Sequence, residues 1–229
     1  MLNYKVEPEL LQPLVPRGTM LDTWQGVALV TLVGFRFLDT RVLGVAFAGH
    51  VNFDEVNLRF YVRREGPDGA PRRGVVFLRE LVPRRLVTLM ARWVYHEPYL
   101  TVPMRVRIEQ QWSSGGVAGT LRYGWAFRGR PYHIEGRIAG LPTPPEPGSE
   151  EAFVTERLWG FTRRRGGGTL EYRVEHSPWQ VWRAKDVSFH GDPAPLFGTS
   201  LAAALGRPPR SALVADGSPV AVYRGTRIA

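Results

Sequence analysis

The sequence predicts an α+β fold that is mainly antiparallel β sheet with a few helices. Segments of alternating apolar and polar residues, rich in β-branched and aromatic side chains, follow one another along most of the chain. Turns containing Gly or Pro separate these segments at short intervals. No shift in composition marks a domain boundary, so we expect residues 1–229 to form a single domain.

The N-terminal part predicts one short helix followed by strands. Residues 8–16 (PELLQPLVP) carry apolar side chains on one side of a helix. Residues 24–39 are rich in β-branched and aromatic side chains and predict a long, largely buried strand. Residues 53–64 alternate strictly, 66–72 (GPDGAPR) supply turn chemistry, and 73–81 (RGVVFLREL) form the next strand. Together these three segments predict an antiparallel hairpin.

Further helices and strands follow Pro83. Residues 84–97 place apolar side chains at helical spacing, and Pro83 suits a helix start. Short helices are expected at 151–156, where Ser149 can act as the N-cap, and at 195–206. The expected strands are 103–112, 116–127, 131–140, 158–164, 169–176 and 181–190, and a closing segment covers 211–224.

The formal net charge of +9 does not predict nucleic-acid binding. Lysine occurs only at Lys5 and Lys185, so nearly all of the positive charge is arginine. The arginines are dispersed along the chain and do not gather in one arm or helix, as phosphate recognition would favour. The densest run, 163–165, precedes three glycines and is typical of a hairpin turn. We therefore expect no nucleic-acid partner.

Composition also bounds the class of protein. No apolar run reaches the roughly 18 residues that span a bilayer, and the N-terminus lacks the apolar stretch of a signal peptide. We therefore expect a cytoplasmic protein with no membrane partner. The chain contains no cysteine, which excludes disulfides, thiolate metal sites and cysteine nucleophiles.

The common catalytic motifs are missing from the sequence. It contains no phosphate loop, no dinucleotide-binding fingerprint and no nucleophile elbow. Its five histidines are widely separated, so only the fold could assemble a metal site, and we predict no metal and no cofactor. His96, beside Glu97, suits either a general base oriented by a carboxylate or, more commonly, a side chain that satisfies carbonyls at a helix end. The histidines are His50, His96, His133, His176 and His190.

One strand carries polar residues along one face. A period of two places Glu55, Asn57, Arg59 and Tyr61 on the same side of the strand at 53–64. The opposite side is apolar and consists of Val56, Leu58, Phe60 and Val62. Inside a curled sheet the polar face would suit a small polar ligand, and on an open sheet it would contact water. Both alternatives stay open.

The N-terminal segments resemble those of a known family. The pattern YKVEPELLQPLVPRGTMLDTWQGVALVTLVGFRF, followed by VNFDEVNLRFYVRR, GVVFLREL and a helix, resembles the YqjF-like family of uncharacterised bacterial proteins, which is related to acetoacetate decarboxylase. The resemblance to the YqjF-like family covers most of the chain, and the link to the decarboxylase is strongest over the N-terminal part. It implies a curved antiparallel sheet that closes into a cone-like barrel with a central cavity and a few peripheral helices.

The resemblance also bears on chemistry. In the decarboxylase family an Arg-Glu pair is followed by proline and two adjacent lysines, one of which forms a Schiff base with the ketoacid substrate. Arg79, Glu80, Pro83, Arg84 and Arg85 occupy these places here. A guanidinium stays protonated above pH ~12 and cannot form an imine. An arginine can still bind the substrate's carboxylate or a phosphate through two parallel hydrogen bonds, although it cannot react with the substrate. The alternative is that both arginines are solvated or pair with Glu80.

Two functional hypotheses follow. The first is a small-molecule-binding protein, or an enzyme, that acts on an organic acid or similar polar metabolite without a Schiff-base lysine. The second is a non-catalytic binding or interaction module that kept the fold.

Adjacent helical residues diverge by about 100°, so only one of Arg84 and Arg85 can face a cavity, and we expect Arg84 to do so. A homo-oligomer stays open. The predicted ligand-binding residues are Arg59, Glu80, Arg84, Asn57, Tyr61 and Glu55.

Overall fold

The computed structural model of the chain describes every residue except 38–40, 43–44, 47–51, 87, 90–95 and 165. Its strands form a large 14-stranded sheet and a separate four-stranded sheet. Most neighbouring strands are antiparallel, whereas β7 pairs in parallel with β8 and β12, and β17 pairs in parallel with β4. The predicted α+β class with mainly antiparallel strands is confirmed.

The large sheet supplies most of the molecule. Its strand order is β14 (Val181–Arg183), β16 (Ser211–Ala215), β1 (Leu2–Val6), β3 (Ala28–Phe37), β6 (Phe53–Glu65), β7 (Pro71–Val82), β12 (Trp159–Arg163), β13 (Thr169–His176), β17 (Val220–Val222), β4 (Arg41–Val42) and β5 (Val45–Ala46). Three short strands pair beside this path: β2 (Met20–Leu21) on β6, β8 (Tyr99–Thr101) on β7 and β18 (Thr226–Ile228) on β13.

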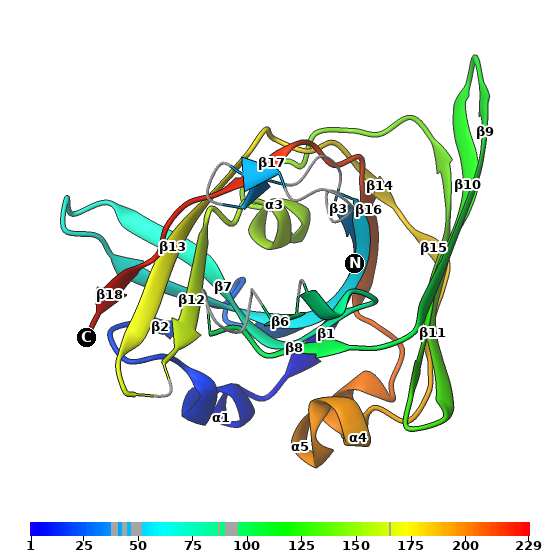
Figure 1. Cartoon of the computed structure of the whole chain (residues 1–229). Helices are drawn as coiled ribbons and strands as arrows, with labels where there is room; N and C mark the ends of the chain where they lie inside the picture. Colours follow the sequence, from blue (N-terminus) through cyan, green and yellow to red (C-terminus); the bar gives the residue numbers. More distant parts are fainter. Residues whose placement is uncertain (38–40, 43–44, 47–51, 87, 90–95, 165) are drawn as a thin grey trace.

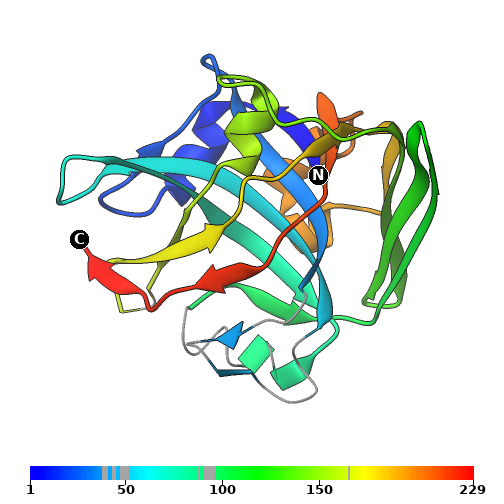
Figure 2. The same cartoon turned by 90° about the horizontal axis from the view of Figure 1, so that it is seen from above.

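Figure 1 shows the large sheet curving around α3, and Figure 2 shows α3 near one end of the sheet. Among the described residues, strand pairing does not close the large sheet into a ring. The closed barrel that the resemblance implies stays a prediction.

The second sheet lies beside the first, on the side of β3 and β16 (Figure 1). Its strand order is β15 (Lys185–His190), β11 (Arg130–Gly140), β10 (Gly116–Phe127) and β9 (Met104–Ser113). The two sheets approach closely at Gly34 of β3. A Cβ atom at Gly34 would lie 2.7 Å from the ring of Tyr123 and 2.9 Å from Ile134. The missing side chain therefore lets β10 and β11 pack directly on β3.

The helices are short. Those whose bounds lie within the described residues are α1 (Pro8–Leu11), the 3-10 helix η1 (Gln12–Leu14), α3 (Glu150–Thr155), α4 (Ala194–Phe197) and α5 (Thr199–Leu205). Ser149 caps α3 as predicted, because its side chain accepts a hydrogen bond from the backbone N–H of Ala152 at 3.1 Å. Within the described residues, no helix is both long and apolar enough to cross a membrane.

Three predicted elements differ in the structure. The helix expected at 195–206 is broken into α4 and α5 at Gly198, whose φ of +87° is incompatible with a continuous helix. The strand expected at 181–190 splits into β14 and β15, which join different sheets. Of the helix expected at 84–97, residues 85–86 and 88–89 are helical, whereas 87 and 90–95 lie outside the described residues. Residues 96–97 are not helical.

Candidate functional site

A hollow of about 1090 Å³ lies against the large sheet, and residues of both sheets line it. Most of its wall is apolar or aromatic, with Phe35, Phe77, Tyr123 and Trp159 among the lining residues. Polar side chains of β6, β7, β8 and the connection after α3 line it, and others come from β3, β13 and the second sheet. An apolar wall with a few convergent polar groups is typical of small-molecule sites.

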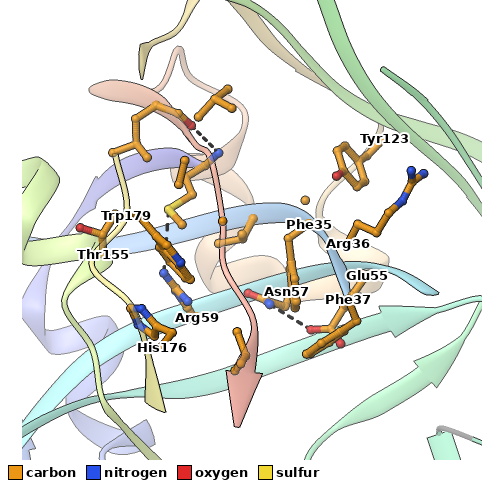
Figure 3. A pocket seen from close by; sticks show the side chains of 18 of the residues that line it. Phe35, Arg36, Phe37, Glu55, Asn57, Arg59, Tyr123, Thr155, His176 and Trp179 are labelled. Carbon is orange, nitrogen blue, oxygen red and sulfur yellow. Dashed lines mark hydrogen bonds between the residues drawn. The ribbon is translucent and has the colours of Figure 1, made fainter. Parts of the chain in front are cut away.

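The polar face of β6 turns toward this hollow. Glu55, Asn57 and Arg59 line it and project from the same side of the strand (Figure 3). The opposite, apolar side of β6 is buried in the main hydrophobic core. Of the two alternatives for this strand, the structure therefore places the polar face inward. Successive side chains of a strand point to opposite faces, and β6 is paired with β3 and β7 along its two edges. Its polar side chains therefore share the face of the sheet that borders the hollow.

A β-bulge places Glu80 beside this face. Leu58 pairs with Arg79 but Arg59 pairs with Phe77, so Leu78 is an extra residue without a partner on β6. The next pair joins Asn57 to Glu80. In a regular ladder continuing from the pair of Arg59 and Phe77, Leu78 would pair with Leu58 and Arg79 would stand opposite Asn57. The Nε of Arg79 instead donates to the backbone oxygen of Leu196 at 3.2 Å, in α4.

The Glu55 carboxyl group is buried and hydrogen-bonded. Its Oε1 accepts from the amide nitrogen of Asn57 at 3.0 Å, and its Oε2 accepts from the hydroxyl of Tyr99 at 2.9 Å. Burial raises the pKa of Glu55 to about 7, although both hydrogen bonds and the charge of Arg59 oppose the rise. Near neutral pH this group therefore exists in both protonation states.

The Glu97 carboxyl group is buried against β12 and β13. Its Oε1 accepts from the hydroxyl of Tyr172 at 2.7 Å and from the hydroxyl of Thr162. Burial raises the pKa of Glu97 to about 8, and the nearby Glu55 adds to the rise. At neutral pH, Glu97 is mainly protonated.

Glu80 completes a carboxyl cluster, which we define as Glu55, Glu80 and Glu97. Only 2% of Glu80 is exposed, and its Oε2 has no hydrogen-bond partner among the described residues. Burial raises its pKa well above the ordinary value, and repulsion from Glu97 and Glu55 raises it further. A buried carboxyl oxygen without a partner is costly, so it marks a place where a ligand atom can bind.

Two arginines line the hollow near α3. The guanidinium of Arg59 donates to the backbone oxygen of Val154 at 3.0 Å. Arg157 pairs with Asp22 at 2.6 Å and lies 3.9 Å above the ring of Phe153. Carbonyls in the last turn of a helix favour nearby cations, which explains why both arginines are held there. Within the described part of the chain, Arg59 Nε and Arg157 Nη2 are buried without a hydrogen-bond partner.

The structure brings together four of the six predicted ligand-binding residues: Glu55, Asn57, Arg59 and Glu80. Tyr61 lies under α3, where its hydroxyl contacts Thr31 Oγ1 at 2.5 Å and its ring packs 4.9 Å from that of Phe153. Tyr61 is therefore buried but does not line the hollow. The ligand-binding role of each residue stays a prediction.

The expected inward orientation of Arg84 is not observed. Both Arg84 and Arg85 are exposed, and neither is among the described residues that line the hollow. Leu86 does line it, although 55% of this side chain is exposed. The segment therefore borders the hollow through Leu86 and presents its arginines to solvent. No ion pair joins Arg84 to Glu80 among the described residues.

Sequence reasoning missed three polar residues of the site. The sequence indicates Glu97 only as a partner of His96, and it gives no signal for Tyr99 or Arg157. The acid directly before Pro98 was the available signal, because a residue before proline favours an extended conformation that ends a helix. Arg157 follows α3 in a connection without periodicity, so no pattern indicated that it lies in the hollow.

Comparisons with known proteins agree with this architecture. Residues 1–219 match DUF2071, a family described as an uncharacterized conserved protein, and the chain belongs to this family. It is 26% identical over 185 residues to the uncharacterized protein YqjF of Bacillus subtilis strain 168, which covers 80% of this chain and 72% of YqjF. The resemblance noted in the sequence is confirmed.

Two solved structures share the fold. The enduracididine biosynthesis enzyme MppR has a TM-score of 0.64 and 15% identity, with 99% of this chain and 84% of MppR covered. Acetoacetate decarboxylase from Legionella pneumophila has a TM-score of 0.61 and 13% identity, with 100% and 83% covered. The fold is therefore acetoacetate decarboxylase-like. At these identities the likeness shows the fold alone.

The raised pKa of Glu97 predicts a dependence of stability on pH. The folded state holds a proton that the unfolded chain releases above pH ~4.5, so this contribution is present at low pH and is lost as the pH rises through about 8. In Glu97→Gln the group no longer ionises. We expect the variant to lose less stability than the wild type between pH ~5 and ~9, with a relative gain of about 1–3 kcal/mol at the upper end.

Urea unfolding followed by circular dichroism across this pH range measures the difference. Glu109→Gln is the matched control, because 69% of the Glu109 side chain is exposed, and its profile should follow the wild type. Parallel profiles for Glu97→Gln and the wild type would show that Glu97 does not bind a proton on folding.

Proposed function

We propose that the protein binds a small organic acid in the hollow. In this proposal Arg59 holds the carboxylate of the ligand, and protonated glutamates of the carboxyl cluster donate hydrogen bonds to its carbonyl or hydroxyl oxygen. The observation that carries the proposal is that an arginine and three buried carboxyl groups, whose pKa values burial raises, face the same hollow. Arg59 Nε and Glu80 Oε2 both lie there without a hydrogen-bond partner among the described residues.

Charge supports an anionic ligand. Burial raises the pKa of Glu97 to about 8, so this group is mainly protonated near neutral pH, and burial also raises the pKa of Glu80 well above its ordinary value. The guanidinium of Arg59 is close enough to Glu55 to oppose the rise in the pKa of Glu55. Arg157 is already paired with Asp22. Arg59 has no carboxylate ion-pair partner among the described residues, so its guanidinium can attract the carboxylate of a ligand.

A neutral carboxyl group can also act on a carbonyl. A protonated glutamate donates a hydrogen bond, as the carboxyl groups of some enzymes do when an apolar site keeps them protonated at neutral pH. Binding alone needs only these contacts. An enzymatic role would add proton donation from Glu80 or Glu55 to the carbonyl oxygen as negative charge develops there.

The fold neighbours support the class of ligand. MppR has been solved with pyruvate, which is a short ketoacid. Imine chemistry is not part of the proposal, because the two lysines of the chain, Lys5 and Lys185, are both exposed and do not line the hollow. Arg84 and Arg85, where the decarboxylase family has its lysines, cannot form an imine. The chain is thus proposed to hold the ligand noncovalently.

Replacement of Arg59 tests the binding role. We expect Arg59→Ala to weaken the binding of pyruvate or acetoacetate at least tenfold, because a charged hydrogen bond is worth about 1.5–3 kcal/mol. The free energy of unfolding should change by about 1–2 kcal/mol, since one hydrogen bond to α3 is lost. Ligand-observed NMR titrations measure the affinity, and urea unfolding measures the stability.

Two further variants sharpen this test. Arg105→Ala removes an exposed arginine of β9 that does not line the hollow, so it should bind as the wild type does. Arg84→Ala asks whether the exposed arginine contributes, and from its position we expect a smaller loss than for Arg59→Ala. Failure of short keto and hydroxy acids to bind at millimolar concentration would contradict the proposal and favour a non-catalytic interaction module.

Reduction by borohydride tests the noncovalent character of binding. We expect no stable adduct on a lysine when the protein is treated with sodium borohydride in the presence of pyruvate or acetoacetate, because neither Lys5 nor Lys185 lines the hollow. Intact-protein mass spectrometry detects such an adduct, and an authentic acetoacetate decarboxylase is the positive control. A stoichiometric adduct on any residue of this chain would mean that imine chemistry is retained.

A further inference from the structure

Three metal-ligating side chains meet on the second sheet, in β11 and β15. They are His133 and Glu135 of β11 and His190 of β15. One ligand atom from each residue lies within 4.8 Å of the other two. Two imidazoles and one carboxylate form a ligand set that is common for zinc and for related ions of the first transition row.

Strand pairing explains why these residues meet although 56 residues separate the two histidines in the sequence. β11 and β15 are antiparallel, and His133 stands directly opposite His190. The next residues on each strand, Ile134 and Phe189, pack on the main core, so the alternation of side chains turns both histidines to the other face. Glu135, two residues after His133, shares that face.

The two imidazoles already lie side by side. Their ring centres are 4.4 Å apart, and the rings are within 23° of parallel. A shared ion requires the two rings to tilt so that one nitrogen of each ring points at it. The Nε2 of His133 lies 3.9 Å from Glu135 Oε2, and Ser188 donates to the other carboxyl oxygen, Oε1, at 3.3 Å. Such a second contact orients a carboxylate ligand.

We propose that His133, Glu135 and His190 bind one divalent transition-metal ion of the zinc type, with water in the remaining coordination position. A tetrahedral ion with ligands at about 2.0–2.1 Å needs its ligand atoms roughly 3.4 Å apart. The present separations, up to 4.8 Å, require side-chain shifts of about 1 Å. His190 is exposed and Glu135 is partly exposed, so these shifts meet little packing.

Arg122 competes with the ion for the same carboxylate. Its Nη1 lies 3.3 Å from Glu135 Oε2, and Arg122 pairs directly with Glu135 across β10 and β11. A bound metal would take this oxygen and release the guanidinium to solvent, which 51% of the Arg122 side chain already contacts. Removal of the arginine should therefore strengthen metal binding, an effect that a nonspecific surface site would not show.

The ion would join two strands at an irregular place. The pairing of β11 and β15 shifts register between Glu135 and Arg137, and β15 is an edge strand of its sheet. An ion with ligands from both strands would cross-link the edge strand β15 to β11. A metal that binds only the folded state raises stability according to its concentration relative to Kd. The site does not rest on the function proposed for the hollow.

Zinc titration tests the proposal. Untagged protein is treated with chelator and titrated with zinc chloride by isothermal calorimetry. We expect one ion per chain in the wild type, and at least a tenfold loss of affinity in each of His133→Ala and His190→Ala. Arg122→Gln should bind zinc several-fold more tightly. His176→Gln is the control, because His176 stacks on Trp179 away from this sheet, and it should match the wild type.

A second readout separates ligand loss from misfolding. Thermal unfolding without metal shows whether each variant folds, and addition of zinc should raise the midpoint of the wild type but not that of His190→Ala. Cobalt(II) in place of zinc should give absorption bands typical of a site with four or five ligands. Wild-type zinc affinity in both histidine variants, or no stoichiometric binding by the wild type, would overturn the proposal.

Discussion

The burial of three carboxyl groups in one space constrains the whole site. A carboxylate without water is costly, and like charges close together add to the cost. The chain offers Asn57 and Tyr99 to Glu55, and Thr162 and Tyr172 to Glu97. These donors do not cancel the effect of burial, so the cluster retains protons near neutral pH. The resulting hollow is less negative than its composition indicates.

The backbone determines which charges share this space. The bulge at Leu78 turns Glu80 toward Asn57 and sends Arg79 to α4. The short α3 holds Arg59 through a backbone carbonyl at another part of the same hollow. The site therefore depends on one extra residue in β7 and on the position of one short helix. Both features are small, yet they determine where a carboxyl group and where a guanidinium lines the hollow.

The sequence indicated the β6 face because alternation is a local property. Period two was sufficient to separate Glu55, Asn57 and Arg59 from the apolar side of the strand, and the turn-rich segment after it indicated the hairpin with β7. The bulge was not visible, since no glycine or proline marks Leu78. The break at Gly198 is not predicted, because the run of leucine and alanine at 201–205 that follows it favours a helix.

Contacts between segments far apart in the sequence could not be predicted from local patterns. Glu97 meets β12 and β13, and His133 meets His190, only because strands far apart in the sequence become neighbours. The arginine pair illustrates the converse. Its place after a strand and a proline resembled the lysine pair of the decarboxylases, and an inward orientation was expected for one arginine. Both arginines are exposed, and the proposed cation of the site is Arg59.

Direct titration of the glutamates tests the central claim, which is that burial raises the pKa values of all three carboxyl groups so that the cluster retains protons near neutral pH. NMR of protein labelled with ¹³C at the glutamate carboxyl carbon follows each resonance against pH, with Glu→Gln variants at Glu55, Glu80 and Glu97 for assignment. We expect Glu55 to titrate at about 7, Glu97 at about 8 and Glu80 well above the ordinary glutamate value. Titration of all three groups below pH ~5, as in exposed glutamates, would contradict the account.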